Sequence, residues 1–195
     1  MKVKLLFLIL SLTNTIFIFS QQVITFRGYN WRTSINEIMK NEHELPETYS
    51  TNNYYSLTYN RNMAGYNAEV IFSFYNNQLY RGTYELILPK NRDDVYYMDI
   101  YKDLQNKLIS LYGEQNIYRN DPPVYNENQI NTMKTARFSG SSIVTIWMTP
   151  PYNSHSNLSL MLSYSNIMEC WSISISYFDP EHYNGWRSEL NTEGL

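Results

Sequence analysis

Two segments near the C-terminal end of the chain alternate strictly between apolar and small polar residues. Residues 158–164 and residues 171–177 carry leucine, isoleucine, tryptophan or tyrosine at every second position, with serines and one methionine between them. Successive side chains of a strand point to opposite faces, so each segment has one face for a core and one for water. Short connections along the chain favour antiparallel pairing. The sequence therefore predicts an antiparallel sheet that is buried on one face.

Other segments rich in aromatic and β-branched residues extend this sheet. Asn76 and Asn77 lie between two of these segments and suit a tight hairpin turn. The additional predicted strands are residues 54–59, 69–75, 78–88 and 142–148.

A first helix is predicted from residue 34 onward. Ser34 and Glu37 have the spacing of a capping box, in which the hydroxyl binds a free amide and the carboxylate reaches back. Ile35, Ile38 and Met39 then recur at helical spacing.

A second helix carries one long apolar stripe. Asp93 and Asp94 can cap its start, and Gly113 suits a left-handed C-terminal cap. The spacing of four, three, four and three residues predicts that the stripe faces the sheet, with Lys107 on the opposite side. The stripe consists of Tyr97, Tyr101, Leu104, Leu108 and Leu111.

These patterns define the expected fold class as α+β. We expect an antiparallel sheet of about six strands with two helices packed on one face, in the order helix, three strands, helix, three strands. Residues 21–195 form a single domain in this interpretation. The repeated order leaves open two structurally similar halves, about residues 24–90 and 94–178.

The first twenty residues have the pattern of a secretory signal peptide. Lys2 and Lys4 precede an apolar run, and Ser20 precedes two glutamines. Polar residues 11–15 interrupt the run, which is therefore shorter than a membrane-spanning helix requires. We expect an extracytoplasmic protein, periplasmic or secreted; retention of the segment as an anchor stays open.

The cysteine content and the net charge restrict the expected cellular location and the classes of partner. Cys170 is the only cysteine, so the chain has no internal disulfide, and a bacterial exported protein is the simpler interpretation. The formal net charge of −3 argues against sequence-independent nucleic-acid binding, which needs a basic surface. No second apolar run reaches membrane length, so we expect no membrane span after signal cleavage.

Four short motifs resemble those of small exported bacterial proteins of unknown function. They are residues 26–31 (FRGYNW), 34–38 (SINEI), 65–70 (GYNAEV) and 111–114 (LYGE). The opening is also similar to that of the beta-lactamase-inhibitor-like and SmpA/OmlA-like α+β modules. The resemblance covers roughly residues 24–178 and implies a binding or scaffold domain without catalytic residues.

The inventory of reactive side chains gives little support to catalysis. His43, His155 and His182 are far apart in sequence, and no zinc or calcium motif is complete, so we expect no metal and no cofactor. Cys170 begins a strand and is expected to be a half-buried or exposed structural residue. The acidic cluster of Glu42, Glu44 and Glu47 is expected to be a solvated surface.

A small hydrolase of the cell exterior remains the alternative function. Asp179, Glu181 and His182 could supply an acid and a base for the hydrolysis of carbohydrate or peptide. Acids in a polar terminal segment more often only increase solubility.

Aromatic residues favour recognition instead. Tyrosines are concentrated in the first half of the expected sheet, and a tyrosine combines apolar area with a hydrogen-bonding tip. The serines of residues 171–177 would form a shallow solvent face beside them. We therefore expect a non-catalytic binding or envelope-associated domain that contacts a protein or an envelope component through its sheet. The candidate partner-binding residues are Tyr66, Tyr75, Tyr80, Ser172, Ser174 and Ser176.

Overall fold

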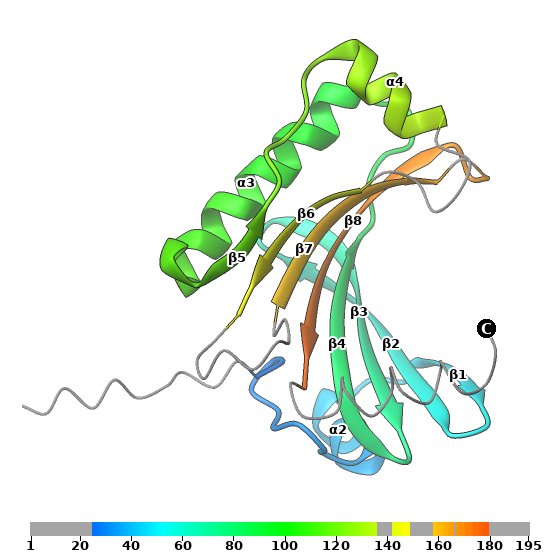
Figure 1. The fold of residues 1–195 in the computed structure, drawn as a ribbon. Coiled ribbons are helices and arrows are strands. Elements are labelled where there is room, and N and C mark those ends of the chain that lie inside the picture. The colour runs from blue at the N-terminus through cyan, green and yellow to red at the C-terminus, as the bar shows by residue number, and fades with distance from the viewer. Residues whose placement is uncertain (1–24, 136–141, 149–157, 166, 180–195) are drawn as a thin grey trace, which may run out of the picture.

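An antiparallel sheet of eight strands forms the body of the protein (Figure 1). The structure is a computed structural model and describes residues 25–135, 142–148, 158–165 and 167–179. The expected signal peptide, residues 1–20, lies outside these ranges. The spatial order of the strands is β1-β2-β3-β4-β8-β7-β6-β5, so the chain builds two four-stranded meanders that meet where β4 pairs with β8.

The first meander contains the strands β1 Glu47–Thr51, β2 Tyr54–Met63, β3 Tyr66–Tyr75 and β4 Gln78–Leu86. The second contains β5 Ile117–Asn120, β6 Ser142–Trp147, β7 Leu158–Ser165 and β8 Cys170–Phe178. The described helices are α2 Ile35–Glu42, α3 Asp94–Tyr112 and α4 Glu127–Thr135, with a 3₁₀ turn at Glu114–Asn116.

The hairpin between β3 and β4 confirms the predicted turn. Asn76 and Asn77 have φ angles of 49° and 63°. Two consecutive residues with positive φ match the twist of the flanking strands, and asparagine tolerates this conformation better than most residues do.

The helix α2 also begins as predicted. The Ser34 hydroxyl accepts a hydrogen bond from the backbone N–H of Glu37. Ile38 is fully buried, whereas Met39 at the edge of the stripe is 37% exposed.

The helix α3 packs against β7 and β8 through the predicted stripe, except at its last member. Asp93 caps the helix by accepting from the Tyr96 amide, and Leu104 and Leu108 are at most 5% exposed. Leu111 is 67% exposed, so its predicted burial was wrong. A spacing of 3.5 residues drifts around a helix of 3.6 residues per turn, and Tyr112 packs on the core in the last turn instead.

The described fold has two strands and one helix more than the expected six strands and two helices. The strand β1 is exposed along its whole length, and β5 is short and has an irregular register with β6, so neither shows an apolar alternation. The helix α4 was not predicted; it buries only Ile130 and Met133, so its sequence shows no long apolar stripe. The coarser prediction, an α+β fold with an antiparallel sheet, is confirmed.

One hydrophobic cluster joins the helices to a single face of the sheet. Members of α2, α3 and α4 belong to this cluster together with alternate residues of β2, β3, β6, β7 and β8. Phe26, which precedes α2, packs its ring directly over Gly82 of β4 and lies 5.1 Å from the ring of Phe72. A side chain at position 82 would occupy the space of this ring, which explains the glycine in a strand interior.

Candidate functional site

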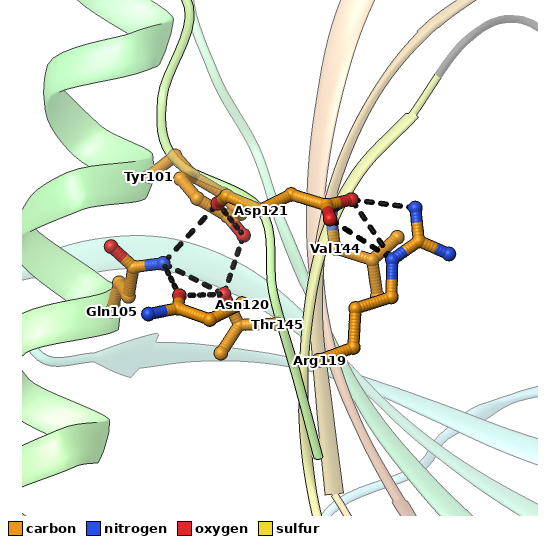
Figure 2. A network of polar contacts seen from close by, with 7 residues as sticks. All are labelled: Tyr101, Gln105, Arg119, Asn120, Asp121, Val144 and Thr145. Carbon is orange, nitrogen blue, oxygen red and sulfur yellow. Dashed lines mark hydrogen bonds and ion pairs between the residues drawn. The ribbon is translucent and has the colours of Figure 1, made fainter. Parts of the chain in front are cut away.

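A buried polar network connects α3 with β5 and β6 (Figure 2). The Thr145 hydroxyl lies 2.7 Å from the Tyr101 hydroxyl and accepts a hydrogen bond from the Gln105 amide, also at 2.7 Å. Gln105 donates a second bond to the Asn120 carbonyl at 2.8 Å. Tyr101 also donates weakly to the backbone carbonyl of Asp121 at 3.4 Å.

This network is structural in character. Thr145 and Tyr101 have no exposed surface, and burial raises the pKa of Tyr101 to about 12, which keeps its hydroxyl protonated. Asp121 lies at the border of the network (Figure 2), where hydrogen bonds from Arg119 hold its pKa below the usual value. Each of these polar groups has a protein partner, so the network fixes α3 on the sheet and offers no free group for chemistry.

A second polar cluster surrounds Glu42 at the end of α2. The Glu42 side chain is only 6% exposed and receives hydrogen bonds from Arg27, Tyr29 and Arg61. The interpretation of this acidic segment as a solvated surface was therefore wrong for Glu42. Arg61 also pairs with Glu44, whereas Glu47 is exposed. A carboxylate shared by two arginines is already neutralised and links α2 to the N-terminal segment and to β2.

Of the three residues considered for a hydrolase, the structure describes Asp179. Glu181 and His182 lie outside the described residues. Asp179 is 3% exposed, in contrast to the solubilising role expected for it, and its carboxylate lies 3.5 Å from the Arg32 guanidinium. Its backbone N–H donates to the Tyr80 carbonyl. Asp179 therefore anchors the end of β8 beside β4. Cys170 is half-buried at the start of β8, as expected.

The sheet face opposite the described helices, which we call the open face because no described helix covers it, carries most of the expected partner-binding residues. Strand pairing aligns Thr83 with Ser176, and the hydroxyl oxygens of this pair are 3.1 Å apart. Ser174 lies between Glu85 of β4 and Met161 of β7. Ser172 pairs with Ser163, and their hydroxyl oxygens are 3.0 Å apart.

The tyrosines divide between the two faces. Tyr75 pairs with Tyr54 on the open face, with ring centroids 5.0 Å apart. Tyr80 is partly buried there, and this burial raises the pKa of its hydroxyl. Tyr66 lies on the helix face instead, where it donates to Asp103 of α3 at 3.3 Å. The structure thus places all expected partner-binding residues except Tyr66 on the open face, spread along its strands from Tyr75 at one end to Ser172 at the other.

Arg81 is the open-face residue that the sequence interpretation missed. Its Nε donates to the Thr83 hydroxyl and its Nη2 to the Ser176 hydroxyl, both at 3.1 Å. The guanidinium carbon lies 5.4 Å from the centroid of the Phe178 ring. The sequence did contain a signal for this residue, because alternation along the predicted strand places Arg81, Thr83 and Glu85 on one face.

Within the described ranges, no group of three or more histidine, cysteine or acidic residues is placed to hold a metal ion. No described helix is long and apolar enough to span a membrane. The chain matches no protein-family model, no curated protein and no solved structure. The resemblance to exported α+β modules therefore stays a prediction.

Proposed function

We propose that the protein is an exported, non-catalytic binding domain that recognises a protein partner through the open face of its sheet. The observation that carries this proposal is the one-sided arrangement of the fold. All three described helices join the core on one face, while the other face carries hydroxyl and aromatic side chains in register across neighbouring strands, with Thr83 and Ser176 buried among them. Such a face suits broad contact, with tyrosines as anchoring side chains.

The polar clusters of the helix face support this assignment over a hydrolase. Glu42 and Asp121 are carboxylates that arginines already engage, and Asp179 lies against Arg32. A general acid or base needs a group that can exchange a proton with substrate at the operating pH. No specific contact among the described residues favours the alternative of a carbohydrate or peptide hydrolase.

Ser174 is the most informative position for a test, because it lies at the centre of the open face. Its strand neighbours Glu85 and Met161 are exposed, so an arginine side chain at position 174 can extend into solvent beside Glu85. We expect Ser174→Arg to leave the thermal midpoint of unfolding within a few degrees. The same substitution should strongly reduce recovery of a partner when the tagged protein is used in a pull-down from bacterial envelope extract.

Two further variants make this experiment specific. Ser110→Arg places the same side chain on the exposed surface of α3 and should retain the partner. Ile173→Asp places a carboxylate at a fully buried position of β8 and should unfold the domain. Equal loss of partner with Ser110→Arg and Ser174→Arg would contradict recognition through the open face.

A further inference from the structure

Arg81 differs from Arg27 and Arg61, whose side chains are 29% and 19% exposed, in what surrounds its charge. Arg27 and Arg61 each lie within 4 Å of a carboxylate. Within the described residues, the partners of Arg81 are the hydroxyls of Thr83 and Ser176, the ring of Phe178 and, through electrostatics, the Tyr80 hydroxyl; none of them is a carboxylate. Neutral hydroxyls compensate less than a carboxylate does for the removal of a guanidinium from water.

The surroundings hold this guanidinium in one orientation. Thr83 and Ser176 are 4% and 3% exposed, and their hydroxyl oxygens are also within hydrogen-bonding distance of each other. Both are therefore fixed acceptors and not mobile surface groups. They engage two of the five N–H donors of Arg81, and Nη1 makes no further side-chain bond within the described residues.

From this arrangement we infer that Arg81, supported by Thr83 and Ser176, is a binding subsite for a carboxylate side chain of the protein partner. A planar guanidinium that is already oriented can donate two parallel hydrogen bonds to a carboxylate at little entropic cost. The partly apolar surroundings, with Phe178 on one side, strengthen such a contact relative to water. The inference rests on the proposed function, because it identifies the chemistry of the partner at the same face.

The distribution of charge on β4 fixes where the partner's carboxylate can lie. Glu85 is on the same strand and face as Arg81, four residues further on, and Glu69 of β3 is directly opposite Glu85. At about 3.3 Å per residue, this acidic pair is about 13 Å from Arg81 along the strand. An acidic side chain is therefore attracted at the Arg81 end of the open face and repelled at the other end.

The test is a titration of the purified full-length protein, with the side-chain Nε–Hε signal of each arginine followed by NMR. The probe is a blocked peptide Gly-Ser-Glu-Ser-Gly, and the matched peptide carries glutamine in place of glutamate. We expect the Arg81 signal to shift with the glutamate peptide at concentrations on the order of millimolar and not with the glutamine peptide. Arg92, an exposed arginine beside Tyr96, is the internal control and should shift little.

Two variants and a second anion separate the outcomes. Arg81→Lys retains the charge without the planar fork, and Arg81→Gln removes the charge; the latter should weaken peptide binding about tenfold or more. Arg92→Gln should leave it unchanged. Inorganic phosphate that shifts Arg81 at lower concentration than the glutamate peptide would overturn the assignment to a carboxylate. Equal shifts with both peptides, or no shift of Arg81, would also overturn it.

These results are distinguishable from failure of the proposed function. If Ser174→Arg abolishes partner recovery while the Arg81 signal does not shift with the glutamate peptide, the open face binds its partner without this subsite. If Arg81 binds the peptide while Ser174→Arg retains the partner, the carboxylate subsite exists but the partner contacts another surface.

Discussion

Replacement of Thr145 by valine tests whether the buried network between α3 and the sheet stabilises the fold. Valine has nearly the shape of threonine, so the change removes the hydroxyl and leaves packing largely intact. The hydroxyl has two short contacts, at 2.7 Å to Tyr101 and at 2.7 Å to Gln105, and a longer one at 3.4 Å to Asn120. The fully buried position leaves no room for water to replace it.

The expected loss follows from what each partner retains. Gln105 keeps its bond to Asn120 at 2.8 Å, so its loss is about one ordinary hydrogen bond, roughly 1 kcal/mol. Tyr101 keeps only a weak contact to the Asp121 carbonyl at 3.4 Å, so its buried hydroxyl becomes poorly satisfied, at a further cost of roughly 1 kcal/mol. We therefore expect Thr145→Val to lower the free energy of unfolding by about 2 kcal/mol.

The assay is equilibrium unfolding in urea followed by far-ultraviolet circular dichroism. Thr48→Val on the exposed strand β1 is the matched control and should change stability by less than about 0.5 kcal/mol. A double-mutant cycle of Thr145→Val with Tyr101→Phe should give a coupling energy of about 1 kcal/mol, because both changes remove the same hydrogen bond. A neutral or stabilising Thr145→Val, or additive effects in the cycle, would refute the assignment of a stabilising network.

Three further perturbations test the packing of α3, the packing at Gly82 in β4 and the charge of Asp94 at the start of α3. Leu108→Ala should destabilise by about 2–5 kcal/mol, whereas Lys107→Ala on the exposed side of α3 should cost less than about 0.5 kcal/mol in the same urea titration; equal effects would reverse the faces of the helix. Gly82→Ala should lower stability by about 1–3 kcal/mol, since its methyl group would displace the Phe26 ring; an unchanged urea midpoint would contradict that packing. Burial acts to raise the pKa of Asp94, but hydrogen bonds from the Trp171 indole and from Lys134 lower it below 3.8. The ionised Asp94 therefore stabilises the fold above pH 3.8, and this contribution is lost as the pH falls through the lower pKa of the folded state. Unfolding free energies measured from pH 6 to pH 2 should fall less steeply for the Asp94→Asn variant.

The parts of the fold that the sequence predicted are those in which burial repeats along the chain. The amino-acid sequences of β7 and β8 alternate between apolar and small polar residues over residues 158–164 and 171–177, apart from Met161, and α3 has four buried stripe residues at regular spacing. The caps at Ser34 and Asp93 were also recognisable, because a cap needs only a local hydrogen bond. Such signals are contained in short stretches of sequence, so no tertiary information is needed to read them.

The missed elements depend on partners that are distant in sequence. The strand β1 exists because its backbone pairs with β2, and its five exposed side chains contribute no pattern. The helix α4 is held by contacts such as the one between Lys134 and Asp94 of α3, 40 residues away. The same limit explains Glu42, whose arginine partners come from the N-terminal segment and from β2.

The surroundings of Arg81 could be predicted only in part from the sequence, because β4 is irregular just before this residue. The register between β3 and β4 shifts after Ser73, so that Leu79 and Gly82 both lie on the core face although they are three residues apart. Strict alternation of side chains between the two faces does not hold across this shift. If the alternation of the residues after the shift is extended backwards, the residues before it are assigned to the wrong face. The same shift places Tyr80 and Arg81, which are neighbours in sequence, together on the open face. A β-bulge of this kind reorients side chains that a regular strand would separate. Here it puts Tyr80 and Arg81 on the same face, where the Tyr80 hydroxyl interacts electrostatically with the guanidinium that we propose as the anchor for the partner.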